Sequence, residues 1–211
     1  MVTDDARIDL VVDYDHYTRV TRGLVEGARV ELWIATANVK SVFVEAPVGT
    51  RARARGRYVS LVETLAALAR RGVDVRILHA STPSGPFRAE LARQASAGIA
   101  MRQCPRVHMK MIARDGAELY LGSANLTGAG LGAKGDKRRN FELGVVTSSA
   151  RLLEAAQARF DAIWRGRECA SCAMRRECPK PIDTFTSLGT KPRASRSPAA
   201  PSPPSSRRRR A

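Results

Sequence analysis

The sequence is short of aromatic residues, of histidine and of long apolar runs. Phe, Trp and Tyr make up 5% of its 211 residues, which leaves little surface for stacking against bases. Histidine occurs three times, at His16, His79 and His108. No apolar run approaches the roughly 20 residues of a membrane-spanning helix. The chain begins with the acidic stretch "MVTDDARIDLVVDYDH", where a secretion signal needs a basic start, so we expect a soluble cytoplasmic protein.

Acidic residues are scarce as well. The chain has 20 Asp and Glu against 36 Lys and Arg, which gives a formal net charge of +16. The last 33 residues hold eight of the basic residues and one Asp, so residues 1–178 still carry +9 (28 basic, 19 acidic). A positive excess spread in this way favours a polyanionic partner, either nucleic acid or an anionic membrane surface.

Unusually reactive side chains occupy a stretch that alternates like a β-hairpin, "VHMKMIARDGAELYLGSANLT". His108 and Lys110 are two residues apart and share one face, whereas the residues between and beside them are apolar. Asp115-Gly116 is a strong two-residue turn, after which the chain returns as a second strand. Ser123 and Asn125 follow at the far end of that strand. The hairpin therefore predicts that these four polar side chains meet in one small volume.

The spacing in this stretch resembles the signature of the phospholipase D superfamily, His-x-Lys-x4-Asp followed by Gly-Ser-x-Asn. The matching residues are His108, Lys110, Asp115, Gly122, Ser123 and Asn125. Further on, "RRNFELGVVT" is similar to a strand of the superfamily's small nucleases that carries an Asn-x-Glu element, here Asn140 and Glu142. The resemblance covers residues 8 to 165. It implies a phospholipase D-like α/β/α sandwich around a mixed β-sheet, with one motif per chain.

The residue types in the motif suit a phosphodiesterase. A neutral imidazole is a competent nucleophile toward phosphorus, so His108 is expected to form a phosphohistidine intermediate. Negative charge grows on the phosphoryl oxygens in the transition state, where a fixed cation and amide donors help most. Lys110 and Asn125 fit that task, with Ser123 assisting. The scheme needs no divalent metal.

Two further residues of the candidate site have supporting roles. The resemblance implies that Glu142 hydrogen-bonds a histidine and holds its tautomer. Asp115 belongs to the motif, but we expect it to fix the turn rather than to contact the substrate.

The scheme also needs a second histidine, because the leaving oxygen must be protonated. His79 ends an expected strand and is more typical of a structural residue, and His16 lies in a polar helical stretch and is expected at the surface. The superfamily's single-motif members solve this by homodimerising, so that each site takes one motif from each chain. A symmetric interface achieves this with no second gene copy. We therefore expect a homodimer that shares one active site.

Cysteines form a second cluster, in "CASCAMRRECP". The four cysteines of the chain are Cys104, Cys169, Cys172 and Cys178. In a cytoplasmic chain such thiols indicate a metal sooner than disulfides, and four thiolates suit structural Zn²⁺ or, alternatively, an iron–sulfur cluster. The spacing partly resembles the cluster loop of endonuclease III-type glycosylases, but Ala162 stands where that family has a further cysteine. Unligated thiols or disulfides are the remaining alternative.

Strands that alternate with helices indicate the α/β class. The expected helices cover 16–28, 58–72, about 87–96 and 149–164, and the expected strands cover 29–36, 73–80, the two arms of the hairpin and 140–147. We divide the chain into a catalytic domain at 1–165, a Cys-rich segment at 166–182 packed on it, and a disordered basic tail rich in Pro, Ser and Arg at 183–211.

Basic loops decide between the functions that remain open. The segment 51–57, "RARARGR", and the segment 134–139, "KGDKRR", read as loops, and the second follows the Gly-Ser-Ala-Asn element. Its candidate substrate-binding residues are Lys134, Lys137, Arg138 and Arg139. They favour a nuclease acting on DNA or RNA. The alternatives are a phospholipase D or phosphatidyl transferase, and a non-catalytic nucleic-acid-binding protein.

Overall fold

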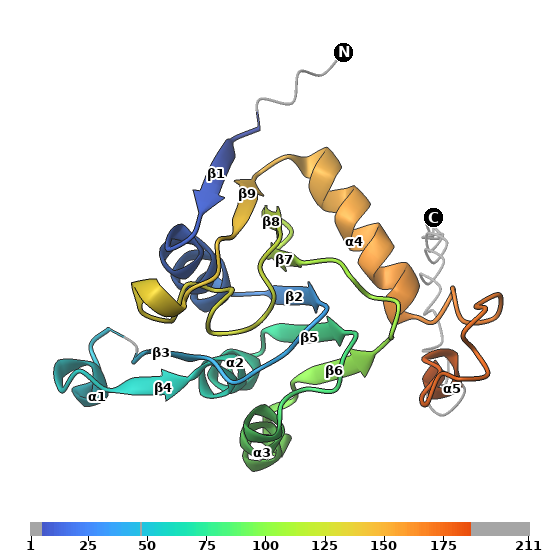
Figure 1. Cartoon of the computed structure of the whole chain (residues 1–211), viewed down its shortest axis with the longest axis horizontal. Helices are drawn as coiled ribbons and strands as arrows, with labels where there is room; N and C mark the ends of the chain where they lie inside the picture. The colour runs from blue at the N-terminus through green and yellow to red at the C-terminus, as the bar shows by residue number, and fades with distance from the viewer. Residues whose placement is uncertain (1–5, 47, 187–211) are drawn as a thin grey trace, which may run out of the picture.

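A computed structural model describes residues 6–46 and 48–186 of the chain. It contains a mixed seven-stranded sheet with the strand order β1-β9-β8-β7-β2-β5-β6 (Figure 1). The strands are β1 (Ile8–Val12), β2 (Glu31–Thr36), β5 (Asp74–His79), β6 (Ala100–Gln103), β7 (Met111–Arg114), β8 (Glu118–Gly122) and β9 (Leu143–Thr147). β2, β5 and β6 run parallel to one another, whereas β1, β9, β8, β7 and β2 pair antiparallel along the sheet. The α/β class with a mixed sheet is therefore confirmed.

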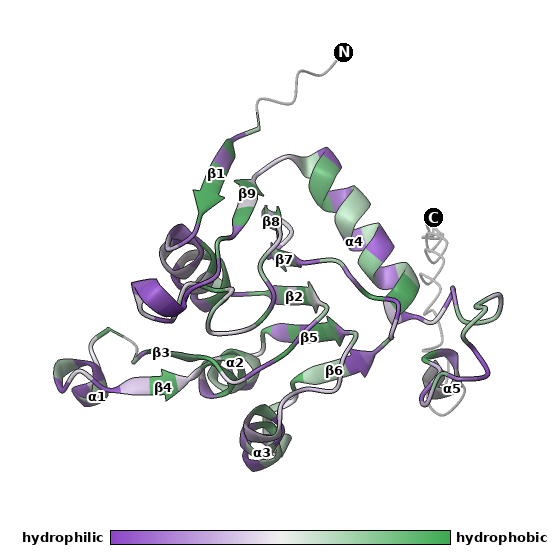
Figure 2. Ribbon diagram, in the orientation of Figure 1, coloured by the Kyte–Doolittle hydropathy of each residue, from purple (hydrophilic) through white to green (hydrophobic). Residues whose placement is uncertain are grey.

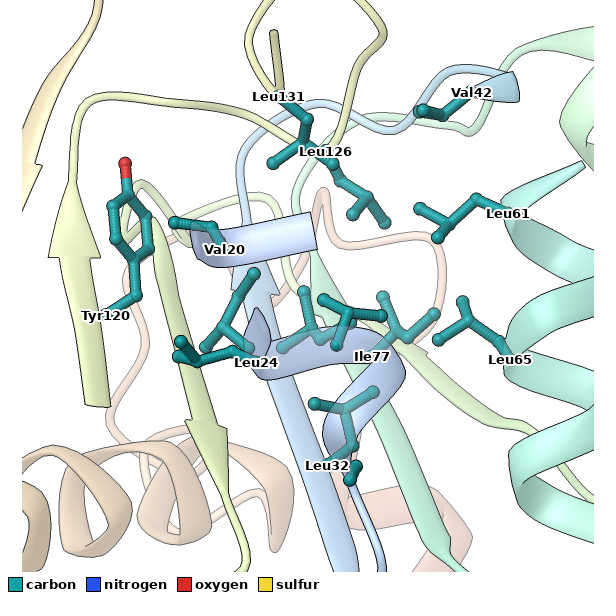
Figure 3. Packing of buried hydrophobic residues seen from close by; sticks show 14 of the residues in the cluster. Val20, Leu24, Leu32, Val42, Leu61, Leu65, Ile77, Tyr120, Leu126 and Leu131 are labelled. Carbon is teal, nitrogen blue, oxygen red and sulfur yellow. The ribbon is translucent and has the colours of Figure 1, made fainter. Parts of the chain in front are cut away.

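Helices cover both faces of the sheet. On one face pack η1 (His16–Val25), α2 (Leu61–Arg70) and α3 (Gly85–Arg93), and the apolar cluster between these helices and the sheet includes Leu24, Leu65 and Ile77 (Figure 3). On the other face α4 (Ala150–Trp164) lies along the sheet (Figure 1) and packs Phe160 against Met111 and Leu119. Alternate residues of the strands β2, β5, β6, β7 and β8 supply the two cores, as the two-residue period of a strand requires.

Local capping explains where several elements begin. Ser149 accepts a hydrogen bond from the backbone N–H of Leu152 and caps α4. Ser60 caps α2 in the same way, so the expected helix at 58–72 starts at Leu61. The three residues before it form β4 (Tyr58–Ser60), which pairs with β3 (Phe43–Glu45).

Some expectations were wrong in detail. The segment 51–57 contains a short helix, α1 (Arg51–Ala54), because Thr50 caps it by accepting from the N–H of Arg53. The expected loop at 134–139 holds a 3₁₀ turn, η3 (Asp136–Arg138). The helix expected near 87–96 begins earlier and is followed by the 3₁₀ turn η2 (Ala95–Ala97). The strand expected at 140–147 begins at Leu143, and the strand β1 was not predicted.

The described chain ends in an irregular segment and a short helix. Residues 166–182 follow α4 mostly as turns, and α5 (Asp183–Thr186) adds one helical turn inside the segment that we expected to be disordered. The rest of the predicted tail, 187–211, lies outside the described residues. Within the described part of the chain, no helix combines the length and the apolar character that crossing a membrane requires.

Candidate active site

His108 and Lys110 lie in the extended segment that leads into β7. Val107 and Met111 are buried and Met109 packs against the core under α4, so the predicted alternation holds here. The Lys110 ammonium lies 3.1 Å from each ring nitrogen of His108 and 3.0 Å from the His108 carbonyl oxygen. A cation thus stands directly beside the imidazole that is the candidate nucleophile.

The hairpin turn has the predicted place and a left-handed backbone, with φ of 55° at Asp115 and 62° at Gly116. The Asp115 carboxylate accepts backbone N–H groups of the segment that opens β2, at 2.7 Å from Val30 N and 3.0 Å from Glu31 N. Burial alone would raise the pKa of Asp115, but these hydrogen bonds outweigh it and hold the pKa below its usual value. Asp115 therefore ties the turn to the start of β2. The whole of β7 separates it from Lys110, so Asp115 does not lie at the candidate site.

Ser123 and Glu142 meet where β8 and β9 open into loops. The Ser123 hydroxyl donates to Glu142 Oε2 and accepts the N–H of Leu143 at 3.0 Å. Asn140 Nδ2 donates to Glu142 Oε1 at 2.9 Å, and Glu142 N donates to the carboxylate of Asp13 at 2.9 Å. Among the described residues of this single chain Glu142 has no hydrogen bond to a histidine, and the expectation that it holds one stays a prediction. Its carboxylate orients Ser123 and Asn140 instead.

Asn125 is oriented by residues at the end of β2. Its side-chain oxygen accepts the N–H of Asn38 at 3.0 Å and lies 3.3 Å from the Thr36 hydroxyl. Thr36 Oγ1 also accepts the N–H of Leu126 at 3.0 Å. Because these donors hold the oxygen, the Nδ2 group of Asn125 is the end available to a phosphoryl oxygen. Sequence reasoning missed Thr36 and Asn38, although they follow a buried strand at its carboxyl end, where sites commonly form.

A buried pair lies below the Ser123 loop. The Tyr120 ring fills the space that side chains would take at Gly122 and Gly144, where a Cβ would overlap the ring or its hydroxyl. The hydroxyl lies 2.9 Å from His16 Nε2 and accepts the N–H of Ala124 at 3.3 Å. In Figure 3 Tyr120 stands at the edge of the core beside Val20, with its hydroxyl pointing away from the aliphatic side chains. Because the Tyr120 ring and hydroxyl occupy that space, positions 122 and 144 require glycine.

Of the two histidines outside the motif, His79 lies as expected from the sequence and His16 does not. His16 was expected at the surface, but its side chain is fully buried because the helix η1 turns it toward Tyr120. Burial lowers the pKa of His16, which favours the neutral ring, although the carbonyl of Asp13 and the charge of Glu142 oppose the shift. His79 is buried with Nδ1 2.9 Å from the carbonyl of Ser81, as expected of a structural residue.

An open cleft of about 590 Å³ exposes part of the motif, but Asn125 is not among the residues that line it. His108, Lys110 and Ser123 line it together with Arg159 of α4. The rest of its lining is apolar and consists of Met109, Met111, Leu121, Gly122, Leu152, Ala155 and Ala156. The site is therefore a polar constellation beside an apolar wall that β7, β8 and α4 build.

Comparison with known proteins places the fold. A family profile described as "Cardiolipin synthase, PLD-like domain" matches residues 26–164, which include the whole His-x-Lys motif and the Gly-Ser-x-Asn element. The chain belongs to the phospholipase D superfamily. Together with the intact motif, this membership indicates an enzyme of the phosphodiesterase type. No curated protein sequence matches the chain.

Solved structures with the same fold share little sequence with it. The phospholipase D family member Nuc from Salmonella typhimurium is 19% identical, with a TM-score of 0.55 over 76% of this chain and 95% of that one. NucT from Helicobacter pylori is 15% identical, with a TM-score of 0.51 over 74% of this chain and 94% of that one. TrmBL2, an archaeal chromatin protein described as having a novel mode of DNA binding, is 16% identical, with a TM-score of 0.50 over 78% of this chain and 55% of that one.

The candidate substrate-binding residues lie in the loop before Asn140. Lys134, Lys137 and Arg138 are exposed, and Arg139 pairs with Asp136 and stacks over the ring of Tyr14. Lys134 and Arg139 line a hollow with three tyrosines, Tyr14, Tyr17 and Tyr58. The structure thus gathers three of the four tyrosines of the chain in one hollow, which the low aromatic content did not predict. Its charged lining consists of Lys134 and Arg139 together with Glu45 and Asp136.

Proposed function

We propose that this protein is a nuclease that cleaves phosphodiester bonds of nucleic acid as a homodimer, with His108 as the nucleophile. The observation that carries the proposal is the placement of Lys110 at 3.1 Å from the ring of His108 in a cleft that also exposes Ser123. These groups supply a nucleophile and a fixed cation in one open site.

In the proposed first step a ring nitrogen of His108 attacks phosphorus. A nitrogen–phosphorus bond forms and the bond to the leaving oxygen breaks, so the substrate chain is cut and phosphohistidine remains. Lys110 and the Nδ2 group of Asn125 stabilise the charge that develops on the phosphoryl oxygens, and Ser123, oriented by Glu142, supports them. Water then attacks phosphorus and gives a proton to the histidine of the second copy that protonated the leaving oxygen. The nitrogen–phosphorus bond breaks, the phosphate monoester is released and the His108 imidazole is restored. The fixed cation is Lys110, so the scheme uses no divalent metal.

The leaving oxygen takes its proton from His108 of the second copy in the proposed dimer. Both other histidines of the chain are buried and hydrogen-bonded away from the cleft. The site is therefore incomplete within one chain, since a general acid is missing.

An apolar face beside the cleft offers the surface for that second copy. Four apolar side chains are exposed on the face of the sheet that α4 covers over β7 and β8, namely Ile8, Leu10 and Val12 of β1 and Leu143 of β9. The strand β1 is largely apolar in Figure 2. The cross-strand register joins this face to the cleft through Val145 and Leu121. A monomer rarely exposes such a continuous apolar strip. A two-fold axis beside it would bring two copies of the motif together.

The substrate class follows from the distribution of charge. The hollow with Lys134, Tyr14 and Tyr58 lies next to the site. The Asp13 carboxylate accepts the backbone N–H of Glu142, and the next residue in the chain, Tyr14, lines the hollow. The exposed rings of Tyr14 and Tyr58 can stack on bases, and Lys134 beside them can pair with a phosphate, in a lining that also contains Glu45 and Asp136. The similarity to TrmBL2, which is described as binding DNA, agrees with this direction.

A lipid phosphodiesterase is the second candidate, and the apolar wall of the cleft favours it. This wall comes from the segments of β7, β8 and α4. In the nuclease proposal the second copy covers part of this wall. In the lipid alternative acyl chains would occupy it.

One experiment separates the candidates. The purified full chain is assayed in EDTA on single-stranded and double-stranded DNA, on RNA and on phosphatidylcholine vesicles. The nuclease proposal expects cleavage of at least one nucleic acid at a rate above that of lipid hydrolysis, and none by His108→Ala. Faster hydrolysis of the lipid would establish the alternative. Tight binding of DNA without any cutting, equal in His108→Ala, would indicate a non-catalytic nucleic-acid-binding protein.

A further inference from the structure

Four cysteines that the proposed reaction does not use surround one cavity. Cys104 follows β6, and Cys169, Cys172 and Cys178 belong to the segment after α4, yet all four line the same cavity. Cys104, Cys169 and Cys172 also border an adjoining cavity. Each of the four is a half-buried free thiol. Thiols from two distant parts of the chain therefore face one another across a space.

The cysteines are also the inward-facing side chains of an irregular segment. Between Arg167 and Lys180 the backbone forms turns, and no side chain in that described range is fully buried. The half-buried residues there are Glu168, Cys169, Cys172 and Cys178. Glu168 pairs with Arg159 of α4 at 2.7 Å. Apolar burial cannot account for the order of this segment, whereas a ligand shared by its cysteines can.

Basic side chains lie beside the thiols. Arg106 Nη1 lies 3.7 Å from Cys172 Sγ. Arg175 also lines the cavity. A divalent ion held by four thiolates carries a net charge of about −2, which these cations would balance.

We propose that Cys104, Cys169, Cys172 and Cys178 together bind one structural Zn²⁺ ion. The Cys-x2-Cys spacing of Cys169 and Cys172 and the four-thiolate donor set are typical of such sites. As the side chains lie, no group of three or more His, Cys, Asp or Glu within 6–46 and 48–186 is positioned to hold a metal ion. Binding therefore brings the four thiols closer to one another, and the two adjoining cavities provide the space for that movement.

The ion would connect the Cys-rich segment to the chain that carries the candidate nucleophile. Cys104 N donates to the carbonyl of His79 at 2.8 Å, and the Cys104 carbonyl accepts the N–H of Val107 at 2.9 Å. Val107 directly precedes His108. The ion thus supports the position of His108 without entering the reaction, and its presence does not depend on what the enzyme cleaves.

Elemental analysis of the full chain, purified without chelators, tests the proposal. We expect about one zinc ion per chain. Replacement of zinc by Co²⁺ should give the strong visible absorption of a tetrahedral thiolate site. Cys172→Ser and Cys178→Ser should each lower the zinc content at least several-fold, whereas Ser171→Ala, an exposed neighbour in the same turn, should retain it.

Because the cysteine variants could fail to fold, the wild-type chain provides a second measurement. Removal of zinc with a strong chelator should lower the melting temperature, and added Zn²⁺ should restore it. Metal-free protein whose melting temperature does not respond to the chelator would overturn the proposal. Disulfide-linked cysteines found by mass spectrometry would overturn it too, and stoichiometric iron with sulfide would replace zinc by an iron–sulfur cluster.

Discussion

His16 Nε2 lies 2.9 Å from the hydroxyl of Tyr120, in a buried contact that joins the start of η1 to β8. The other ring nitrogen, Nδ1, lies 3.0 Å from the carbonyl oxygen of Asp13, so it must carry the proton of the neutral ring. Nε2 is then the acceptor and Tyr120 the donor. Tyr120 in turn accepts the N–H of Ala124, between Ser123 and Asn125. The His16–Tyr120 pair thereby holds the backbone between Ser123 and Asn125, and we infer that it positions both side chains.

Tyr120→Phe tests this support. The ring is retained, but His16 Nε2 and the N–H of Ala124 lose their partner, which should cost about 1–3 kcal/mol of unfolding free energy. We also expect kcat to fall by about tenfold or more, since small displacements at a site are costly. Denaturant unfolding and steady-state kinetics measure the two effects.

Tyr17→Phe is a control for the loss of a buried tyrosine hydroxyl, because this hydroxyl accepts the N–H of Glu45 at 3.0 Å away from Ser123. Tyr17 also lines the hollow with Lys134, so the comparison uses kcat and not substrate affinity. The Tyr17→Phe change should lower stability by a similar amount and leave kcat near that of the wild type. An equal fall in kcat for both variants would show that Tyr120 acts on stability alone.

The two buried histidines predict a loss of stability in mild acid. Burial lowers the pKa of His16 and of His79 below the ordinary value of 6.5. The unfolded chain therefore takes up protons first as the pH falls below 6.5, which favours unfolding until the folded-state pKa is passed. We expect full stability above pH 6.5 and a decrease below it. Urea unfolding at several pH values measures this, and His16→Gln should flatten the decrease. An unchanged slope in that variant would exclude His16 as a contributor.

The sequence predicted the parts of the site that are local in the chain. The alternation around His108 and the Asp115-Gly116 pair are both visible in the sequence, so the hairpin and its turn could be predicted from it. The support from Thr36, Asn38 and Tyr120 could not, because it depends on which strands are neighbours in the sheet. His16 was misread for the same reason, since its polar neighbours give no sign of a partner 104 residues away.

His108→Ala should abolish cleavage and leave the fold intact, because the exposed imidazole contributes chemistry and little packing. Lys110→Ala should cause a comparable loss, as the cation beside the ring is removed. Both are measured as initial rates, with the thermal melting curve as the check on folding. A well-folded His108→Ala protein that keeps more than a few per cent of the activity would exclude His108 as the nucleophile.

Affinity for nucleic acid should fall steeply with salt, since cations supply most of the expected contacts. Residues 187–211 contain seven Lys or Arg and no acidic residue, so a chain ending at Thr186 should bind with a smaller salt dependence. Its cleavage rate should be retained, because the motif is untouched. Titrations at several salt concentrations give the slope. If truncation abolished cleavage at low salt, the tail would belong to the catalytic unit.

The proposed shared site predicts that activity depends on the apolar face beside the cleft. Leu10 is 59% exposed on β1 and Leu143 is 56% exposed on β9, and the register places them on the same side of the sheet. Leu10→Asp should be tolerated by the fold because the side chain is largely outside the core. A charge there must be desolvated when a second copy covers the face, so dimerisation should weaken by at least tenfold.

Val48→Asp serves as the control, because Val48 is 79% exposed in a turn outside this face. Light scattering gives the mass, and activity is followed over a range of protein concentrations. We expect Leu10→Asp to be monomeric and nearly inactive when dilute, with activity that returns as its concentration rises. The Val48→Asp chain should remain dimeric and active. Full activity in a monomeric protein would contradict the shared site, and the proton for the leaving oxygen would then have to come from within one chain.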